Sequence, residues 1–202
     1  MGIPDLQGGG QILDLLRGTE RLAVDLIEGP ETVKQALEEV DASWFQYWEA
    51  CNCLILRYQD GYVDWLGVWS DTPAVTIECD FCIMISPAMF QELFLPGLKR
   101  QTKAVGRTIY HLDGEGATRH LDALLELDTL DGIQWVPGAG AKPMGEWIPL
   151  LKRIRDGGKL VVASCAPSEV QPILSALHPE GVLLSTRCNS TEEAEDLVKQ
   201  LT

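Results

Sequence analysis

The residues best suited to chemistry stand together in the segment Tyr110-His-Leu-Asp-Gly114. His111 and Asp113 are two residues apart, so in an extended strand their side chains point to the same face. An imidazole and a carboxylate on one face can bind Zn²⁺ together with a thiolate, or act as a general acid and its orienting partner. The alternative is structural, with His111 hydrogen-bonded to Asp113 or to a backbone carbonyl at the end of the strand.

Cysteines supply the candidates for a third ligand. The chain holds six, at positions 51, 53, 79, 82, 165 and 188, and we expect reduced thiols rather than disulfides. Cys188 fits best because it follows a predicted strand and precedes a helix, whose N-terminus lowers the pKa of a nearby thiol. Cys165 occupies a similar position and is the alternative. The pair Cys79 and Cys82 has redox spacing, but the helix start expected at Ser86-Pro87 comes too late for that chemistry.

An alternation of apolar strands and amphipathic helices positions these residues. Strands covered by helices in this order indicate an α/β protein with a parallel sheet. The predicted strands are 62–69, 108–112, 132–136, 160–164 and 181–186. The predicted helices are 11–17, one from Pro30 into the fifties, one from Ser86, then 117–127, 147–154, 168–177 and 191–201.

Parallel α/β sheets bind substrates at the carboxyl ends of their strands. Trp69 closes the first predicted strand, and Gln134 and Trp135 lie near the end of the third. These three residues are therefore candidates for substrate binding. An aromatic stripe that contains Trp44 and Trp48 in the long helix is expected in the core or at a subunit interface.

Length and charge restrict the class of protein. The 202 residues favour one domain, residues 1–202, and the net charge of −14 disfavours nucleic acid and anionic membranes as partners. No apolar run approaches the ~20 residues that cross a bilayer. We expect neither a signal peptide nor a transmembrane helix, and hence a cytoplasmic protein that acts on a small molecule.

Several segments resemble the uroporphyrinogen decarboxylase superfamily. They are Leu16-Arg-Gly-Thr-Glu20, Asp25-Leu-Ile-Glu28, Asp-Phe-Cys-Ile-Met-Ile-Ser-Pro-Ala-Met-Phe at 80–90, Leu95-Pro96, Tyr110-His-Leu-Asp-Gly114 and Ile133-Gln-Trp-Val-Pro-Gly138. The resemblance implies a TIM (β/α)₈-type barrel. The likeness begins near the third strand, at residues 2–10, and the chain is shorter than the ~250 residues of a full barrel. We therefore expect an incomplete barrel, about strands 3–8, that forms a homo-oligomer to cover its open edges.

The superfamily also contains methyltransferases that pass a methyl group from a corrinoid to a thiol. Their zinc site uses a His-x-Cys pair and a later Cys, which here match His111, Asp113 in place of the first Cys, and Cys188. The resemblance implies Zn²⁺ and a methylated corrinoid donor, either free or carried by a partner protein, with Asp80 and Trp69 at the mouth of the site. The alternatives are a decarboxylase of porphyrin biosynthesis, disfavoured by the missing first strand and the acidic charge, and a truncated non-catalytic relative that binds a ligand or partner.

Overall fold

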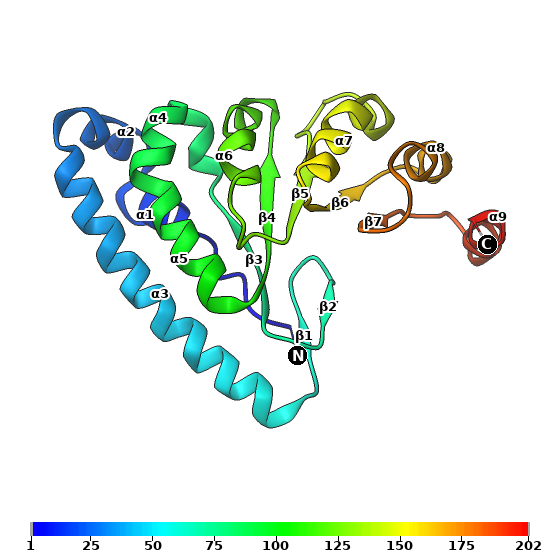
Figure 1. The fold of residues 1–202 in the computed structure, drawn as a ribbon, viewed down its shortest axis with the longest axis horizontal. Coiled ribbons are helices and arrows are strands. Elements are labelled where there is room, and N and C mark those ends of the chain that lie inside the picture. The colour runs from blue at the N-terminus through cyan, green and yellow to red at the C-terminus, as the bar shows by residue number, and fades with distance from the viewer. Residues whose placement is uncertain (1, 202) are drawn as a thin grey trace. The chain divides into compact units, whose positions relative to one another are not determined.

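The computed structural model describes residues 2–201. The chain divides into two compact units, with the boundary between Asp131 and Gly132. Figure 1 shows the helices and strands of each unit along the chain.

The first unit begins with three helices: α1 (Gly9–Arg17), α2 (Thr19–Glu28) and α3 (Pro30–Tyr58). The predicted start of α3 is confirmed, because proline at the first helical position has a preset φ and lacks only an N–H that the helix does not use. A stripe along α3 is buried and consists of Val33, Leu37, Trp44, Trp48 and Ile55. Residues 2–8 form no strand, and α2 was not predicted.

The prediction of a parallel strand over 62–69 is wrong. This segment is a small antiparallel hairpin of β1 (Tyr62–Val63) and β2 (Trp69–Ser70). A turn interrupts the run, because the Asp64 carboxylate accepts a hydrogen bond from the Val68 amide at 3.0 Å and Gly67 has a φ of 77°. The first parallel strand is instead β3 (Ala74–Glu78), which was not predicted.

The rest of the first unit alternates helices with one long strand. Ser86 caps the helix predicted at Ser86-Pro87, since its hydroxyl accepts a hydrogen bond from the Met89 amide. The elements are the 3₁₀ helix η1 (Asp80–Met84), α4 (Pro87–Met89), the π-helical turn η2 (Phe90–Phe94), α5 (Leu95–Val105), β4 (Arg107–Asp113), the 3₁₀ helix η3 (Glu115–His120) and α6 (Leu121–Leu125).

The parallel pair β3–β4 has two different faces. In its register Ile77 lies beside Tyr110, and Glu78 lies beside His111. Ile77 and Tyr110 are buried on the face that packs against α3 and α5. Because strand side chains alternate, His111 belongs to the other face. Glu78, at the end of β3, is half-buried like His111 and also lines the cavity next to α1.

The second unit continues the pattern of parallel strands and helices. Its strands β5 (Gly132–Val136), β6 (Leu160–Ser164) and β7 (Val182–Ser185) pair in parallel and in chain order. Its helices are the 3₁₀ helix η4 (Met144–Trp147), α7 (Ile148–Asp156), α8 (Pro167–Leu177) and α9 (Thr191–Leu201). The predicted α/β class with parallel strands is confirmed. None of the described helices is both long enough and apolar enough to span a membrane.

Candidate metal centre

Three potential metal ligands converge in the first unit. They are Asp80, from η1, and His111 and Asp113, from β4, and one ligand atom from each lies within 4.8 Å of the others. His111 and Asp113 share a face of β4, as their spacing predicts. Asp80 is the acidic residue expected at the mouth of the site.

The local fold holds this cluster from two sides. The side-chain oxygen of Gln11, on α1, accepts hydrogen bonds from the backbone amides of Asp80 and Phe81 at 2.8 and 3.2 Å. Gln11 is only 8% exposed, so α1 fixes the start of η1 firmly. Gly114, with a φ of 78°, ends β4 directly after Asp113 and turns the chain away from the strand.

Trp65 covers the imidazole and was missed by the sequence analysis. Its ring meets the His111 ring edge-on, with centroids 5.3 Å apart and planes at 68°. Asp64 anchors this hairpin loop to the sheet, because its carboxylate accepts a hydrogen bond from the buried Thr76 hydroxyl. Trp69, the predicted aromatic, lies in β2 and is 62% exposed. The turn between Asp64 and Gly67 makes this segment a hairpin rather than one strand. Recognising that turn in the sequence would have placed Trp65 in a loop near the site.

The electrostatic environment of the cluster is acidic. Burial raises the pKa of Glu78, and the neighbouring charges of Asp5, Asp80 and Asp113 raise it further, while His111 lowers it. The pKa of Asp80 is also raised, first by burial and then by Asp113 and Asp5, again against the effect of His111. Several carboxylates therefore lie around a single imidazole. A bound cation would stabilise their negative charges.

One carboxylate oxygen within the cluster has no partner. Asp113 Oδ1 is buried and accepts no hydrogen bond from the part of the chain that the structure describes. A buried carboxylate oxygen without a donor is costly. A metal ion bound by Asp113 would satisfy it.

The donor set fits a divalent ion such as Zn²⁺. Zinc accepts imidazole nitrogen and carboxylate oxygen at ~2.0–2.2 Å, and catalytic sites use three protein ligands and one open position. In a tetrahedral site with these bond lengths the ligand atoms lie ~3.3–3.6 Å apart, so the side chains, now within 4.8 Å of one another, must rotate closer together to bind one ion. Because two of the three ligands are carboxylates, which are hard ligands in the hard–soft sense, the site is less selective for zinc than a site with thiolate ligands.

The remaining predicted site residues belong to the second unit. Cys188 is half-buried in the loop between β7 and α9, and its role as a ligand stays a prediction. Gln134 is 9% exposed, and Trp135 is fully buried, with its ring 5.0 Å from that of Trp147. Burial raises the pKa of the Cys165 thiol, and the charge of Glu169 adds to this effect.

The pair Cys79 and Cys82 is buried and poor in thiolate. A 3₁₀ helix does begin directly after Cys79, earlier than predicted. Burial nevertheless raises the pKa of Cys82 to about 11 and that of Cys79 well above its ordinary value. Since the thiolate is the reactive form, these two side chains act as core residues.

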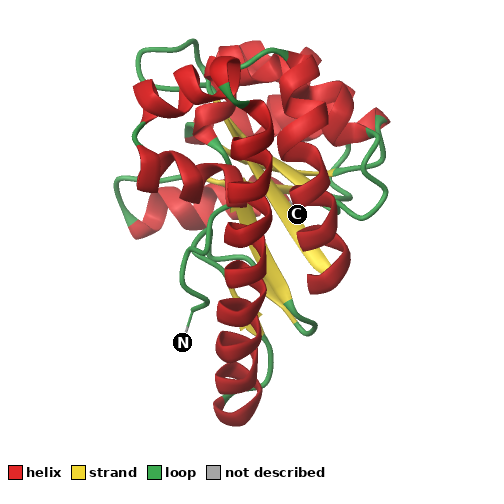
Figure 2. Cartoon of the chain, turned by 90° about the vertical axis from the view of Figure 1, so that its left-hand side faces the viewer, coloured by secondary structure: helices red, strands yellow, loops and turns green. Residues whose placement is uncertain are grey.

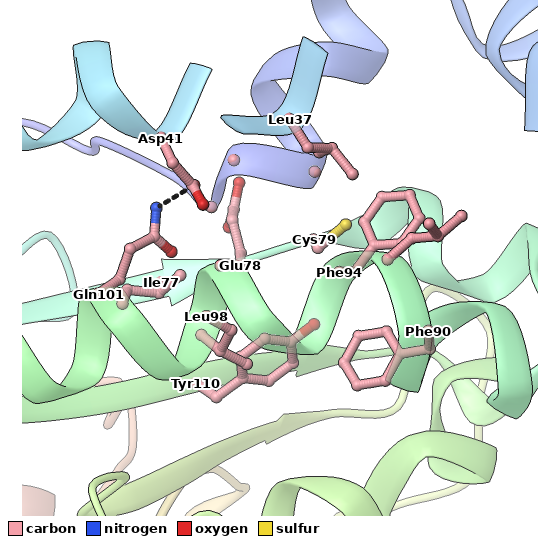
Figure 3. A pocket seen from close by; sticks show the side chains of 15 residues that line it. Leu37, Asp41, Ile77, Glu78, Cys79, Phe90, Phe94, Leu98, Gln101 and Tyr110 are labelled. Carbon is pink, nitrogen blue, oxygen red and sulfur yellow. Dashed lines mark hydrogen bonds between the residues drawn. The ribbon is translucent and has the colours of Figure 1, made fainter. Parts of the chain in front are cut away.

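Figure 3 shows a small cavity between α1, α3, α5 and the sheet, lined mostly by apolar side chains and glycines. Asp41 lies at its edge and accepts hydrogen bonds from Arg100 and, at 3.4 Å, from Gln101. The cavity measures about 20 Å³, which accommodates about one water molecule. It is a structural cavity, too small for a substrate.

Comparisons with models of known protein families found no match, and comparison with curated proteins found no significant match. The likeness to the uroporphyrinogen decarboxylase superfamily therefore rests on the sequence segments quoted above.

Proposed function

We propose that the chain is a metal-dependent methyltransferase of the uroporphyrinogen decarboxylase superfamily, built on part of a TIM barrel, that transfers a methyl group from a corrinoid-type donor to a thiol. The observation that supports it is the convergence of Asp80, His111 and Asp113 within 4.8 Å. The corrinoid donor and the thiol acceptor rest on the resemblance.

The three residues would hold the ion and leave one position open for the substrate. A divalent ion there would supply Lewis-acid chemistry, which lowers the pKa of a thiol so that it reacts as the thiolate. Glu78 lies beside His111 in the sheet register. Its raised pKa suits the Glu78 carboxylate to accept the thiol proton.

Trp65 and the carboxylates shape the rest of the site. The Trp65 ring restricts rotation of the His111 ring and shields it from water. The acidic surroundings, which include Asp5 and Glu78, repel a substrate that carries many carboxylates. This repulsion argues against porphyrinogen decarboxylation as the activity of this site.

A methyl-transfer assay tests the proposal. Zinc-loaded protein is mixed with methylcobalamin and a small thiol, and loss of the methyl–cobalt bond is followed in the visible spectrum. We expect turnover in the wild type and in His178→Ala, since His178 is exposed and lies in the other unit. We expect none in His111→Ala. Stoichiometric zinc binding without turnover would instead favour the non-catalytic relative.

The prediction that Cys188 is a ligand together with His111 and Asp113 is tested separately. Co²⁺ bound to a thiolate gives a charge-transfer band in the near ultraviolet that nitrogen and oxygen ligands do not give. A band lost in Cys188→Ser but kept in Cys165→Ser would assign the thiolate to Cys188. A Co²⁺ complex without the band would limit the ligands to those of the first unit.

A further inference from the structure

Helix α3 carries a second apolar stripe that the first unit covers only in part, at Ala36 and Val40. It lies next to the buried stripe and consists of Ala36, Val40, Ser43, Tyr47, Ala50, Leu54 and Tyr58. Its large members are open to solvent: Tyr47 is 68% exposed, Leu54 53% and Tyr58 67%. Figure 2 looks onto α3, which runs down the front of the view. An exposed apolar face of this length marks an interaction surface.

The N-terminal half of the stripe forms one wall of a groove. The opposite wall is built by Leu6 and by Ile12 and Leu16 of α1. The lining of the groove ends at Tyr47, and farther along the helix Leu54 and Tyr58 are exposed. One half of the surface is therefore concave, and the other half offers protruding side chains.

The residues of the stripe repeat every seven positions, in two rows. Val40, Tyr47 and Leu54 form a row of large side chains, and Ala36, Ser43 and Ala50 form a row of small ones. Seven-residue spacing keeps both rows on one side of the helix. In an antiparallel helix pair, the large row of each helix packs over the small row of the other.

Charged residues at the edge of the stripe favour the same arrangement. Glu39 and Arg57 are separated by 57 − 39 = 18 residues, which is about five full turns, so both lie on the same edge. Both are exposed, and neither forms an ion pair within residues 2–201. A two-fold axis perpendicular to two antiparallel helices brings Glu39 of each copy beside Arg57 of the other.

We propose that the chain forms a two-fold symmetric dimer in which α3 packs antiparallel against α3 of a second copy. The protruding C-terminal half of each stripe then occupies the groove of the other copy. Both copies use the same surface, so the assembly ends at a dimer. The stripe is ~33 Å long, and it spans ~20 Å over the N-terminal half with the α1 wall and ~10 Å over the C-terminal half, or ~500 Å² per copy in projection. The two copies together bury ~1,000 Å², which reaches the lower limit of a specific interface. The proposal is independent of the metal centre.

Paired substitutions on the two faces of α3 test the dimer by sedimentation equilibrium. Leu54→Asp places a charge in the stripe, and we expect at least a tenfold weaker association. Leu56→Asp is the matched control, because Leu56 is 63% exposed and lies ~200° around the helix. We expect it to dimerise like the wild type, with circular dichroism showing both variants folded.

A charge exchange tests the antiparallel register. Glu39→Arg and Arg57→Glu should each weaken the dimer several-fold, and the double variant should restore it. A wild type that stays monomeric at ~100 μM, well above the Kd of a specific dimer, would overturn the proposal. So would equal effects of Leu54→Asp and Leu56→Asp, a double variant that does not recover, or a monomer that binds lipid vesicles through the stripe.

Discussion

The buried carboxylate of Asp41 offers a stability test of the first unit. Asp41 is 4% exposed and is packed so closely that a Cβ on Gly97 would lie 2.5 Å from Asp41 Oδ2. Asp41→Ala leaves the amide of Gln101, which is 1% exposed, without its acceptor. An unsatisfied buried group costs ~1–3 kcal/mol, and the 3.4 Å bond places this one at the low end. The Arg100 side chain is 47% exposed, so its ion pair adds only ~0–1 kcal/mol. We expect Asp41→Ala to lower the free energy of unfolding by about 1–2 kcal/mol.

Asp41→Asn separates the hydrogen bonds from the charge. Burial raises the pKa of Asp41, and the opposing effect of Arg100 is smaller. A raised native pKa means that the stability contributed by the protonated form is present below the unfolded pKa and is lost as the pH rises through the folded pKa. Asparagine keeps an acceptor for Arg100 and carries no charge. We expect Asp41→Asn to gain stability relative to the wild type as the pH rises from about 4 to 7.

Urea unfolding at several pH values measures both effects. The free energy of unfolding of each variant is compared with that of the wild type at the same pH, with equal m-values required. If raising the pH stabilises the wild type relative to Asp41→Asn, the ion pair with Arg100 outweighs desolvation, and the reasoning is wrong. Equal losses in the Ala and Asn variants would also contradict it.

Three further predictions concern packing and the metal centre. Gly10→Ala should destabilise the fold by ~1–3 kcal/mol in urea unfolding, because the new Cβ would lie 2.3 Å from a ring carbon of Phe94. Zn²⁺ affinity measured by calorimetry should increase between about pH 5 and 7, since the pKa values of Asp80 and Glu78 are raised and protons compete with the ion; a flat profile would contradict this. Trp65→Ala should weaken Zn²⁺ binding about tenfold, because the ring that orients the imidazole ligand is lost, and an unchanged affinity would remove Trp65 from the site.

Much of the fold could be predicted from the spacing of apolar residues and from proline and serine at the starts of helices. Strands 132–136 and 160–164 and the helix at 191–201 occur at the predicted residues. These segments are either apolar strands bounded by turns or helices with a regular amphipathic pattern, so local sequence and tertiary packing favour the same structure.

The errors cluster around the hairpin that precedes β3. The apolar run 62–69 resembles one strand, but the Asp64 side chain and Gly67 close a turn inside it. The strand Ala74–Glu78 contains only five residues and follows a polar loop. Its pattern of apolar residues is therefore too short to predict a strand. This error also led to the wrong aromatic residue in the predicted site, because Trp65 rather than Trp69 contacts His111.

The metal ligands could be predicted only in part. The two-residue spacing of His111 and Asp113 fixes their common face of β4. Asp80 precedes β4 by about thirty residues, and its place depends on the β3–β4 pairing and on Gln11, which binds the start of η1. Such long-range contacts leave no periodic pattern in the sequence.

Titration of Zn²⁺ into metal-free protein tests whether Asp80, His111 and Asp113 bind a metal ion. Isothermal calorimetry is carried out on the wild type, His111→Ala, Asp80→Asn and Asp113→Asn, with His178→Ala as the control. We expect one ion per chain in the wild type and the control, and an affinity reduced ~100-fold or more when any of the three ligands is replaced. A wild type that binds no zinc, or binding that persists unchanged in all three ligand variants, would contradict the proposed metal centre.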